Sequence, residues 1–496
     1  MISVLFIQRK DQENINKKMG TKSLFLLSAL VLLSACSDVY SKKLVVCYQG
    51  TWATYRHSFG KFDASHIDPT LCTHIMYAFF GIELDGQIRI IDPYLDLQDN
   101  WGRGNIKKFI QLKSKNPELK VLAAVGGWNE GSLKFSEVAN DPIKRNRFVT
   151  SAVDFVKEHN FDGLDLDWEY PNQRHELATN DDKANFVTLI KELKEALSRN
   201  NLLLTAAVGS AEFSSSVSYN IPEVSKYLDI INVMAYDLHG SWDEVTGINA
   251  PLYEGPNDYT DVEKQLNVHA SISYWLNNGA PREKIVLGMP FYGRTFTLAD
   301  PNQHTVGSPH TGAGLPGQYS NEPGHIGYNE VCEKLQKEDW TYVWEDSQKV
   351  PYIYRGNQWI GFEDQRSIKL KAQYALDQGL AGVMIWSLES DDFHGNCGEK
   401  YILLKTIHSV LDGASYNKPT QSPIIKTTRV PAVTTKAPSS YECASDAMGY
   451  FRDPQECSVF YFCNGKTKYT FRCSPGLGFD TEMNGCNYID QVNCNS

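Results

Sequence analysis

Residues 161–171 read Phe161-Asp-Gly-Leu-Asp-Leu-Asp-Trp-Glu-Tyr-Pro171, and this stretch places four carboxylates within eight positions among apolar neighbours. In an extended strand, successive side chains point to opposite faces of the sheet. Asp165, Asp167 and Glu169 would therefore share one face, while the leucines and the tryptophan between them would share the other. The apolar face predicts a strand that is covered on that side by other parts of the fold.

Three carboxyls on one face of a strand should differ from free carboxyls in their protonation. Like charges held this close cannot all ionise normally, so at least one should keep its proton to a higher pH than a free carboxyl does. Such a row suits general acid catalysis. A divalent-metal site and a solvated polar strand are the alternatives, since carboxylates are also common metal ligands. Asp162 is one residue out of phase with the row, and we expect it to support the strand end.

The same stretch resembles the signature of glycoside hydrolase family 18, the chitinase family, and every position of that signature is filled. The resemblance covers about residues 43–412. It implies an α/β fold, namely a (β/α)8 TIM barrel, with the active site at the C-terminal ends of the strands.

The rest of this region alternates between short apolar runs and longer amphipathic stretches. Seven further apolar runs have the length of buried strands, and they begin at Lys43, His74, Lys120, Leu202, Ile230, Lys284 and Gly382. Residues 142–159 and 181–200 carry apolar residues at helical spacing. With the acidic strand, the runs give eight strands alternating with helices, which predicts a parallel barrel. Residues from about 295 to 363 are too many for one crossover, and we expect an α+β insertion there, with strands around Tyr342 and Val350.

Composition and charge limit the classes of partner. The 496 residues are 42% hydrophobic and 12% aromatic, which is enough for a sizeable core. The formal net charge of -11 has no accompanying basic stripe, so we expect no nucleic-acid partner.

The N-terminus carries a candidate targeting signal within residues 1–37. A start at Met19 would place a lysine before a 12-residue apolar run, Leu24–Ala35, followed by small residues. We expect secretion, with cleavage between about Cys36 and Ser41, and no membrane span because the run is too short. A bacterial lipoprotein signal that leaves a lipid-anchored Cys36 is the alternative.

Cysteine usage predicts an oxidising destination. If Cys36 leaves with the signal, ten of the 11 cysteines remain, and six of these lie in the last 54 residues. Zinc ligation is the competing interpretation, but the C-terminal spacings lack paired C-x-x-C knuckles and contain no histidine. For the barrel, the resemblance to animal chitinases implies the disulfides Cys47–Cys72 and Cys332–Cys397.

The C-terminal region reads as a linker followed by a small disulfide-rich β module. Residues 413–440 are rich in Thr, Pro and Ser, which predicts an extended linker that O-glycans could lengthen; a spacer without sugars is the alternative. Residues 441–496 contain Gly449-Tyr-Phe-Arg-Asp-Pro-Gln-Glu-Cys-Ser-Val-Phe-Tyr-Phe-Cys463 and resemble the peritrophin-A type chitin-binding domain. That resemblance implies three disulfides, namely Cys443–Cys463, Cys457–Cys494 and Cys473–Cys486. Tyr488 is the candidate sugar platform of this module, whereas Phe460 and Phe462 are expected in its core.

Further family motifs supply the candidate substrate-binding residues. Several aromatic residues are expected at C-terminal strand ends, where they would form a sugar-stacking floor rather than ordinary packing. The complete set of candidates is Tyr48, Phe79, Tyr94, Gly126, Gly127, Trp128, Asn129, Tyr170, Met234, Ala235, Asp237, Tyr292, Arg294 and Trp386. A purely structural role is the alternative for Asp237, Tyr292 and Arg294. Ala124 and Glu389 depart mildly from residues that many family members carry there.

The resemblance also implies a mechanism in which the substrate replaces the enzyme nucleophile. Glu169 would protonate the glycosidic oxygen, the 2-acetamido carbonyl of the sugar would attack C1, and Glu169 would then activate water. Asp167 would orient the acetamide N–H, Asp165 would share a proton with Asp167, and Tyr236 would hold the acetamide oxygen. No metal and no cofactor are needed.

These inferences predict a secreted, endo-acting chitinase that cleaves β-1,4-linked N-acetylglucosamine polymers with retention and is anchored to chitin by its C-terminal module. We expect a monomer whose partners are chitin and chito-oligosaccharides, without membrane association. The main alternative is a non-catalytic chitin lectin or growth-factor-like relative, although such relatives often lack the acid. An endoglycosidase acting on glycan cores is disfavoured by the chitin-binding tail.

Overall fold

The computed structural model describes residues 43–174 and 181–413, and residues 442–492 apart from 446, 455, 465, 474–476, 482–484 and 489–491. Eight parallel strands form the centre of the catalytic region: β1 (Leu44–Gly50), β2 (His74–Ile82), β4 (Lys120–Gly126), β5 (Gly163–Asp167), β6 (Leu203–Gly209), β7 (Ile230–Met234), β8 (Ile285–Pro290) and β15 (Gly382–Trp386). β1 pairs with both β15 and β2, so the sheet closes on itself. The predicted (β/α)8 barrel is therefore confirmed.

The barrel strands divide their side chains between two cores, because successive residues of a strand face opposite sides. Alternate positions such as Val46, Met76 and Leu122 fill the interior of the barrel. Their neighbours, including Val45 and Ile75, belong to the larger core between the strands and the helices. A continuous apolar run is thus what a barrel strand requires, since both of its faces are buried.

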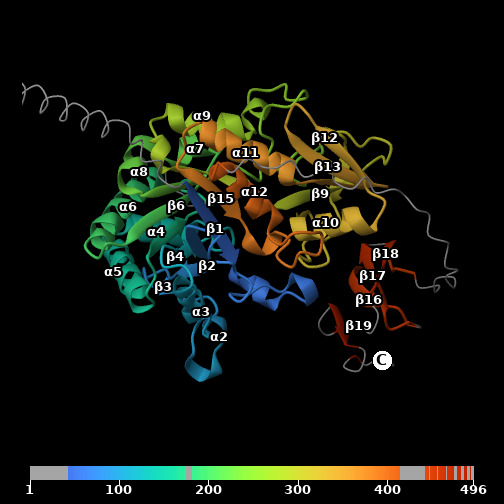
Figure 1. The fold of residues 1–496 in the computed structure, drawn as a ribbon, viewed down its shortest axis with the longest axis horizontal. Coiled ribbons are helices and arrows are strands. Elements are labelled where there is room, and N and C mark those ends of the chain that lie inside the picture. Colours follow the sequence, from blue (N-terminus) through green and yellow to red (C-terminus); the bar gives the residue numbers. More distant parts are fainter. Residues whose placement is uncertain are drawn as a thin grey trace, which may run out of the picture. The chain divides into compact units, whose positions relative to one another are not determined.

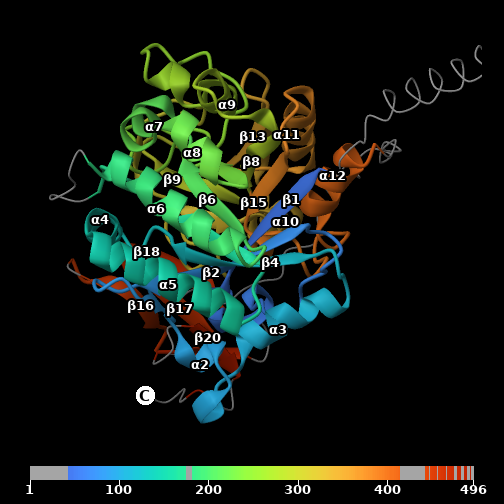
Figure 2. The ribbon, with the colours of Figure 1, turned by 90° about the vertical axis from the view of Figure 1, so that its left-hand side faces the viewer.

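Helices cover the outside of the barrel, as Figures 1 and 2 show for α4, α5 and α6. The helices of this layer are α3 (Asn105–Gln111), α4 (Leu133–Asn140), α5 (Pro142–Glu158), α6 (Asp182–Ser198), α7 (Glu212–Ser218), α8 (Ile221–Tyr227), α9 (Val268–Asn277), α11 (Gln365–Asp377) and α12 (Ile402–Leu411). Within the described ranges, no helix is both long and apolar enough to cross a lipid bilayer.

The expected insertion is an antiparallel sheet with one helix. Its elements are β9 (Tyr292–Leu298), β10 (His310–Ala313), β11 (His325–Gly327), α10 (Tyr328–Lys337), β12 (Thr341–Glu345), β13 (Val350–Arg355) and β14 (Gln358–Gly361). The strand order is β10-β9-β14-β13-β12, with β11 paired to β9. It has its own buried core around Phe296, Tyr352 and Trp359. The strands expected around Tyr342 and Val350 are present as β12 and β13.

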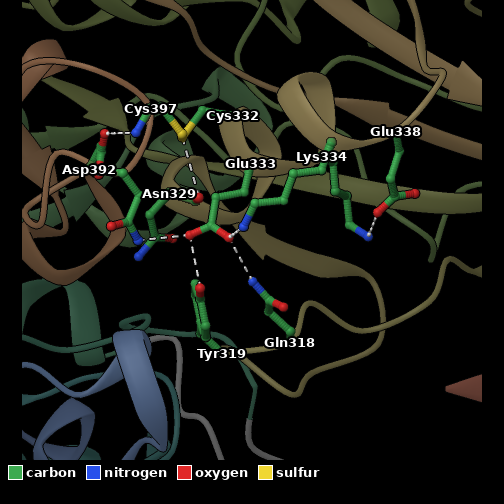
Figure 3. Close-up of polar contacts among 11 residues, drawn as sticks. Gln318, Tyr319, Asn329, Cys332, Glu333, Lys334, Glu338, Asp392 and Cys397 are labelled. Carbon is green, nitrogen blue, oxygen red and sulfur yellow. Dashed lines mark hydrogen bonds and ion pairs between the residues drawn. A yellow bond between two sulfur atoms is a disulfide. The ribbon is translucent and has the colours of Figure 1, made fainter. Parts of the chain in front are cut away.

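Helix α10 is fastened to the segment that follows β15, as Figure 3 shows. Cys332 forms a disulfide with Cys397. Beside it, the Glu333 carboxylate accepts hydrogen bonds from the Tyr319 hydroxyl at 2.8 Å and from Asn396 Nδ2 at 2.9 Å. These contacts join the insertion to the last part of the barrel at a buried carboxylate.

The C-terminal module is built from β16 (Met448–Arg452), β17 (Val459–Asn464) and β18 (Thr467–Arg472) in one antiparallel sheet, with β19 (Leu477–Asp480) and β20 (Gly485–Tyr488) in a second. Phe460 stacks on Phe479 with ring centroids 4.2 Å apart. Cys443 is bonded to Cys463, and Cys457 and Cys473 are also in disulfides.

Several predictions lie outside the described residues. These are the signal within residues 1–37, most of the linker, Cys494 and the side chains of Phe462, Cys486 and Tyr488. They stay predictions. The described disulfide Cys47–Cys72 joins the outward side of β1 to the segment before β2.

Candidate active site

Strand β5 carries two of the three acids of the sequence signature into the barrel. Asp165 and Asp167 are buried, whereas Leu164 and Leu166 belong to the core between strands and helices. The strand ends at Asp167, so the expectation of an extended strand through Glu169 is wrong. Glu169 instead lies two residues beyond the strand and is partly exposed. The geometry therefore separates two interior carboxyls from one at the mouth of the barrel.

Asp165 lies in a polar network that spans the barrel interior. The Tyr48 hydroxyl of β1 donates to Asp165 Oδ2 at 2.7 Å. Thr205 of β6 donates to Asp165 Oδ1 at 2.5 Å, and Asn232 Nδ2 of β7 lies 3.3 Å from the same oxygen. Burial raises the pKa of Asp165 to about 6, and these three donors oppose that rise because they stabilise the ionised form.

Asp167 has a different environment although it is only two residues away. Its Oδ1 is buried and has no hydrogen-bond partner among the described residues. Burial, and then the neighbouring charges of Glu169 and Asp165, raise its pKa well above the ordinary value. Asp167 therefore keeps its proton to a higher pH than a free carboxyl does, and its titration is linked to that of its neighbours. Like-charge repulsion was the expected cause of the raised pKa, but desolvation is the larger one.

Glu169 is suited to proton transfer near neutral pH. Burial raises its pKa to about 7, the Arg174 charge opposes this rise, and Asp237 adds to it. A carboxyl that titrates there can donate a proton in one step and accept one in the next. Its position at the end of the strand leaves it accessible to a bound molecule, unlike the interior acids.

An aromatic floor lies beside the acids. Trp386, at the end of β15, lies 5.7 Å from Phe79 and 5.6 Å from Tyr48 between ring centroids. Trp52, in the turn of 3-10 helix Thr51–Tyr55 after β1, adds a fourth ring 6.1 Å from Trp386. Trp52 is 45% exposed, and the sequence reasoning missed it because it follows the strand instead of ending it. Such faces suit the apolar side of a sugar ring.

Two consecutive glycines at the end of β4 make the close packing here possible. A Cβ on Gly126 would lie 2.1 Å from the Asp167 carbonyl oxygen, and one on Gly127 would lie 2.5 Å from the Phe79 ring. Both residues also have positive φ angles, 118° and 85°. Glycine is therefore required to bring β4 beside both the acid and the floor.

Trp128 follows these glycines and projects outward with 59% of its surface exposed. Asn129, next to it, is also exposed. The Arg174 guanidinium lies over the Trp128 ring at 3.3 Å from the centroid. Sequence reasoning missed Arg174, because nothing in its local sequence indicates this partner.

A second polar group joins the end of β7 to the insertion. Asp237 Oδ1 accepts hydrogen bonds from the Tyr292 hydroxyl at 2.7 Å and from Arg294 Nη2 at 2.6 Å. Tyr236 is packed beside them, with its hydroxyl 3.6 Å from Met384 Sδ, a weak acceptor. Met234 and Ala235 are buried at the strand end.

The remaining candidates lie as follows. Tyr170 packs against the barrel core, and its carbonyl accepts from the Ser132 hydroxyl at 2.7 Å. Tyr94 is exposed on the short helix α2 (Pro93–Asp96), and among the described residues no ring contact joins it to the floor. Asp162 lies at the opposite end of β5 from Glu169, where it accepts from Lys113 Nζ at 2.9 Å and from the Val121 N–H at 2.8 Å. It supports the start of the strand.

The residues whose ligand atoms lie close enough together to hold a metal ion are not those of the acidic strand. Within the described part of the chain, Cys332, Asp392 and Cys397 form such a group. The two sulfurs are bonded to each other, so they are not available as thiolate ligands.

Two family models match this chain, one over the barrel and one over the C-terminal module. The model of glycosyl hydrolases family 18 matches residues 44–391, and that of the chitin binding Peritrophin-A domain matches residues 443–494. An endochitinase of Manduca sexta is 40% identical over 404 residues, which is 79% of this chain and 72% of the relative.

Solved structures agree in fold. A group IV chitinase of Ostrinia furnacalis in complex with allosamidin is 49% identical, with a TM-score of 0.73 over 75% of this chain and 99% of the solved chain. A human pseudo-chitinase with retained chitooligosaccharide binding properties is 36% identical, with a TM-score of 0.68 over 75% of this chain and all of the other. The chain therefore belongs to family 18 of the glycosyl hydrolases, with a chitin binding Peritrophin-A domain near its C-terminus.

Proposed function

We propose that the protein is a secreted chitinase that cleaves internal β-1,4 bonds between N-acetylglucosamine units with retention of configuration. One observation carries this proposal: Glu169, whose pKa is raised to about 7, lies two residues beyond the strand that carries the two interior acids, and one of these, Asp165, accepts a hydrogen bond from Tyr48 of the aromatic floor. The family, the endochitinase relative and the chitin binding domain support chitin as the substrate.

In the proposed first step, protonated Glu169 donates to the glycosidic oxygen while the acetamido carbonyl of the sugar attacks C1. The unpartnered Oδ1 of Asp167 can accept the acetamide N–H. Among the described residues, the Tyr236 hydroxyl has only the weak thioether acceptor of Met384, so it can donate to the acetamide oxygen and hold it in line. Charge that develops on the acetamide is offset as the shared proton moves from Asp167 toward Asp165.

In the second step, Glu169 takes a proton from water, and the water attacks C1 to open the cyclic intermediate. No enzyme nucleophile takes part. This agrees with the environment of the interior acids, since burial raises the pKa of Asp167 and Asp165 already accepts hydrogen bonds from Tyr48, Thr205 and Asn232. Substrate-assisted hydrolysis with two acids in supporting roles fits this arrangement.

Secretion is part of the proposal. The apolar run Leu24–Ala35 supports an export signal, and disulfides in both the barrel and the C-terminal module support an oxidising compartment.

The proposed function is tested by hydrolysis of chito-oligosaccharides by the wild type and by Glu169→Gln. We expect roughly 10²–10⁴-fold lower kcat in the variant, because a positioned proton donor contributes about that much. Binding of the oligosaccharide should remain, since the floor is untouched. The wild-type rate should fall as the pH rises through about 7, where Glu169 loses its proton.

Glu195→Gln, on the exposed side of α6, is the matched control and should behave like the wild type. Full activity of Glu169→Gln would refute the assigned acid. A wild type that binds chito-oligosaccharides without cleaving them would favour a lectin, the class to which the human pseudo-chitinase points.

A further inference from the structure

Arg174 makes three contacts that converge on the mouth of the barrel. Its guanidinium lies 3.3 Å from the centroid of the Trp128 ring. Nη1 donates to the Glu169 carbonyl at 3.0 Å, and Nη2 donates to the Trp128 carbonyl at 3.0 Å. One side chain thus joins the main chain after β4 to the main chain after β5.

These contacts are unusual for a surface arginine. An exposed arginine ordinarily keeps its head in water, and holding it in one geometry costs side-chain entropy. Here the planar head satisfies two carbonyls and covers one face of an indole at the same time, which matches the geometry that arginine has and lysine lacks. Trp128 is 59% exposed, so the rest of the ring remains open to a ligand.

Among the described residues, no ring contact joins Trp128 to the floor. The contacts among Tyr48, Trp52, Phe79 and Trp386 form one group of rings, and the cation–π partner of Trp128 is Arg174. The site therefore offers two aromatic surfaces, with Glu169 linked to the second one through Arg174.

We propose that Arg174 is a positioning residue of the active site, which braces the exposed Trp128 ring and the Glu169 main chain so that the second aromatic surface and the acid keep one relative arrangement for a sugar next to the cleaved bond. This inference rests on the proposed function, because it assigns Trp128 to the binding of a chito-oligosaccharide.

Electrostatics supports the same assignment. Arg174 is the largest influence that holds the pKa of Glu169 down against burial. The other titratable groups that interact with Glu169 are Tyr170, whose hydrogen bond also lowers the pKa, Asp237, which raises it, and Asp167, Tyr219 and Tyr236, whose own pKa values the Glu169 charge raises. Loss of the guanidinium should therefore let the pKa of Glu169 rise.

The test compares kcat, KM and pH profiles of Arg174→Ala, Arg174→Lys and Trp128→Ala on soluble chito-oligosaccharides. For Arg174→Ala we expect roughly a five- to thirtyfold lower kcat/KM, expressed mainly as a higher KM, since a cation–π contact and two charge-assisted hydrogen bonds are lost. The descending limb of the pH profile should move to higher pH. In Arg174→Lys, the descending limb of the pH profile should return to its wild-type position, because lysine keeps the positive charge. The KM should stay high, because contact with the indole and the two carbonyls requires the planar guanidinium.

A matched control exists between helix α11 of the barrel and strand β12 of the insertion. Arg366 lies 3.6 Å over the Trp344 ring, so Arg366→Ala removes a similar stacked arginine away from the acids and should leave kcat, KM and the pH limb unchanged. When Trp128→Ala is already present, adding Arg174→Ala should cause no further rise in KM. It should still move the descending limb of the pH profile to higher pH.

Three results would overturn the proposal: unchanged kcat/KM in Arg174→Ala, tighter binding by that variant, or the same rise of KM with and without Trp128. Calorimetry on the Glu169→Gln chain separates this inference from the proposed function. In the Glu169→Gln background, adding Arg174→Ala should weaken chito-oligosaccharide binding whether or not the wild type hydrolyses the ligand. Unaltered binding would contradict the role of Arg174 and leave the proposed chitinase function untouched.

Discussion

Two buried triads of the same composition show how environment decides the role of a residue. In the first, Tyr48 donates to Asp165 and accepts from Asn232 Nδ2 at 3.2 Å. In the second, Tyr77 donates to Asp96 and accepts from Asn105 Nδ2 at 2.8 Å. Tyr48 faces the barrel interior, whereas Tyr77 belongs to the core between strands and helices. The same three side chains can therefore serve chemistry in one place and packing in another.

Tyr48→Phe should lower kcat while preserving the floor. The phenylalanine keeps the ring beside Trp386, but Asp165 loses the donor at 2.7 Å, and its pKa should rise further above about 6. A hydrogen bond to a charged group is worth about 1.5–3 kcal/mol, so we expect a loss of roughly 10- to 100-fold in kcat. The acidic limb of the kcat profile should move to higher pH, because ionised Asp165 becomes harder to form. An unchanged limb would contradict this role of the hydroxyl.

Tyr77→Phe is the matched control for that experiment. It removes the same hydroxyl from a triad outside the barrel interior and leaves Asp96 and Asn105 each short of a partner. We expect about 1–3 kcal/mol lower stability, measured by urea unfolding, with the pH profile of kcat unaltered. The pair of variants separates loss of a buried hydroxyl from loss of a catalytic network.

Site residues within a local sequence motif could be predicted from the sequence. Thr205, Asn232 and Arg174 could not. Polar and apolar residues alternate in the run Leu164-Asp-Leu-Asp167, so its two faces follow from strand geometry. Thr205 and Asn232 are single polar residues in apolar strands, and their partner becomes visible only when the sheet closes. A usable signal existed, because a polar residue inside a buried strand needs a hydrogen-bond partner. Arg174 had no such signal, since its partners are two main-chain carbonyls and a ring.

At the scale of elements, the N-termini of α12 and α5 are each stabilised by the carboxylate of an aspartate, which is buried in one case and partly exposed in the other. Asp391 is buried. Its carboxylate accepts hydrogen bonds from the N–H of the neighbouring Asp392 and from the N–H groups of Leu403 and Leu404 at the start of α12. Burial nevertheless raises its pKa to about 7. Asp141 is partly exposed and accepts hydrogen bonds from the N–H groups of Ile143 and Lys144 at the start of α5, and these bonds lower its pKa.

The two caps should respond to pH with opposite sign. A raised folded-state pKa means that the stability from Asp391 is complete below the ordinary carboxyl value near 4 and is lost as the pH rises through about 7. Asp391→Asn does not titrate, so its stability relative to the wild type should increase between about pH 5 and pH 8, by on the order of 1 kcal/mol. Urea unfolding at both pH values measures this change. A constant difference would contradict a buried, protonated Asp391.

Asp141→Asn supplies the opposite case on the same protein. A lowered folded-state pKa contributes stability above the ordinary carboxyl value, and this stability is lost as the pH falls through the folded-state pKa. The variant should therefore be less stable than the wild type near neutral pH and approach it in acid. Equal slopes for the two variants would indicate a general effect of removing negative charge.

The barrel elements could be predicted from the sequence because each one is a local pattern. Apolar runs of strand length and helical spacing in residues 142–159 define their elements without knowledge of their neighbours. The start of the insertion is less visible, because β9 begins two residues after β8 ends. Its partners β10 and β14 are brought to it only by the fold, and both strands are four residues long. Short strands that pair with distant segments carry little signal of their own.

At the scale of the whole molecule, the chain combines a barrel with a disulfide-rich module that matches a chitin binding domain. The solved Ostrinia chain is matched over 99% of its length by 75% of this chain. The module is too small for a large core, and its disulfides at Cys443, Cys457 and Cys473 replace part of that core.

Deleting residues 413–496 should affect insoluble chitin and spare soluble oligosaccharides. A tethered binding domain raises the local concentration of the barrel on a polymer without altering the chemistry at Glu169. We expect kcat/KM on soluble chito-oligosaccharides within about twofold of the full chain, and a loss of roughly ten- to a hundredfold on chitin particles at low substrate loading. Tyr488→Ala in the full chain should reproduce part of the loss on particles if that ring is the sugar platform. Full-length Glu169→Gln should still sediment with chitin, which separates anchoring from catalysis. An equal loss on both substrates would show that the tail supports the barrel itself and does not act as an anchor.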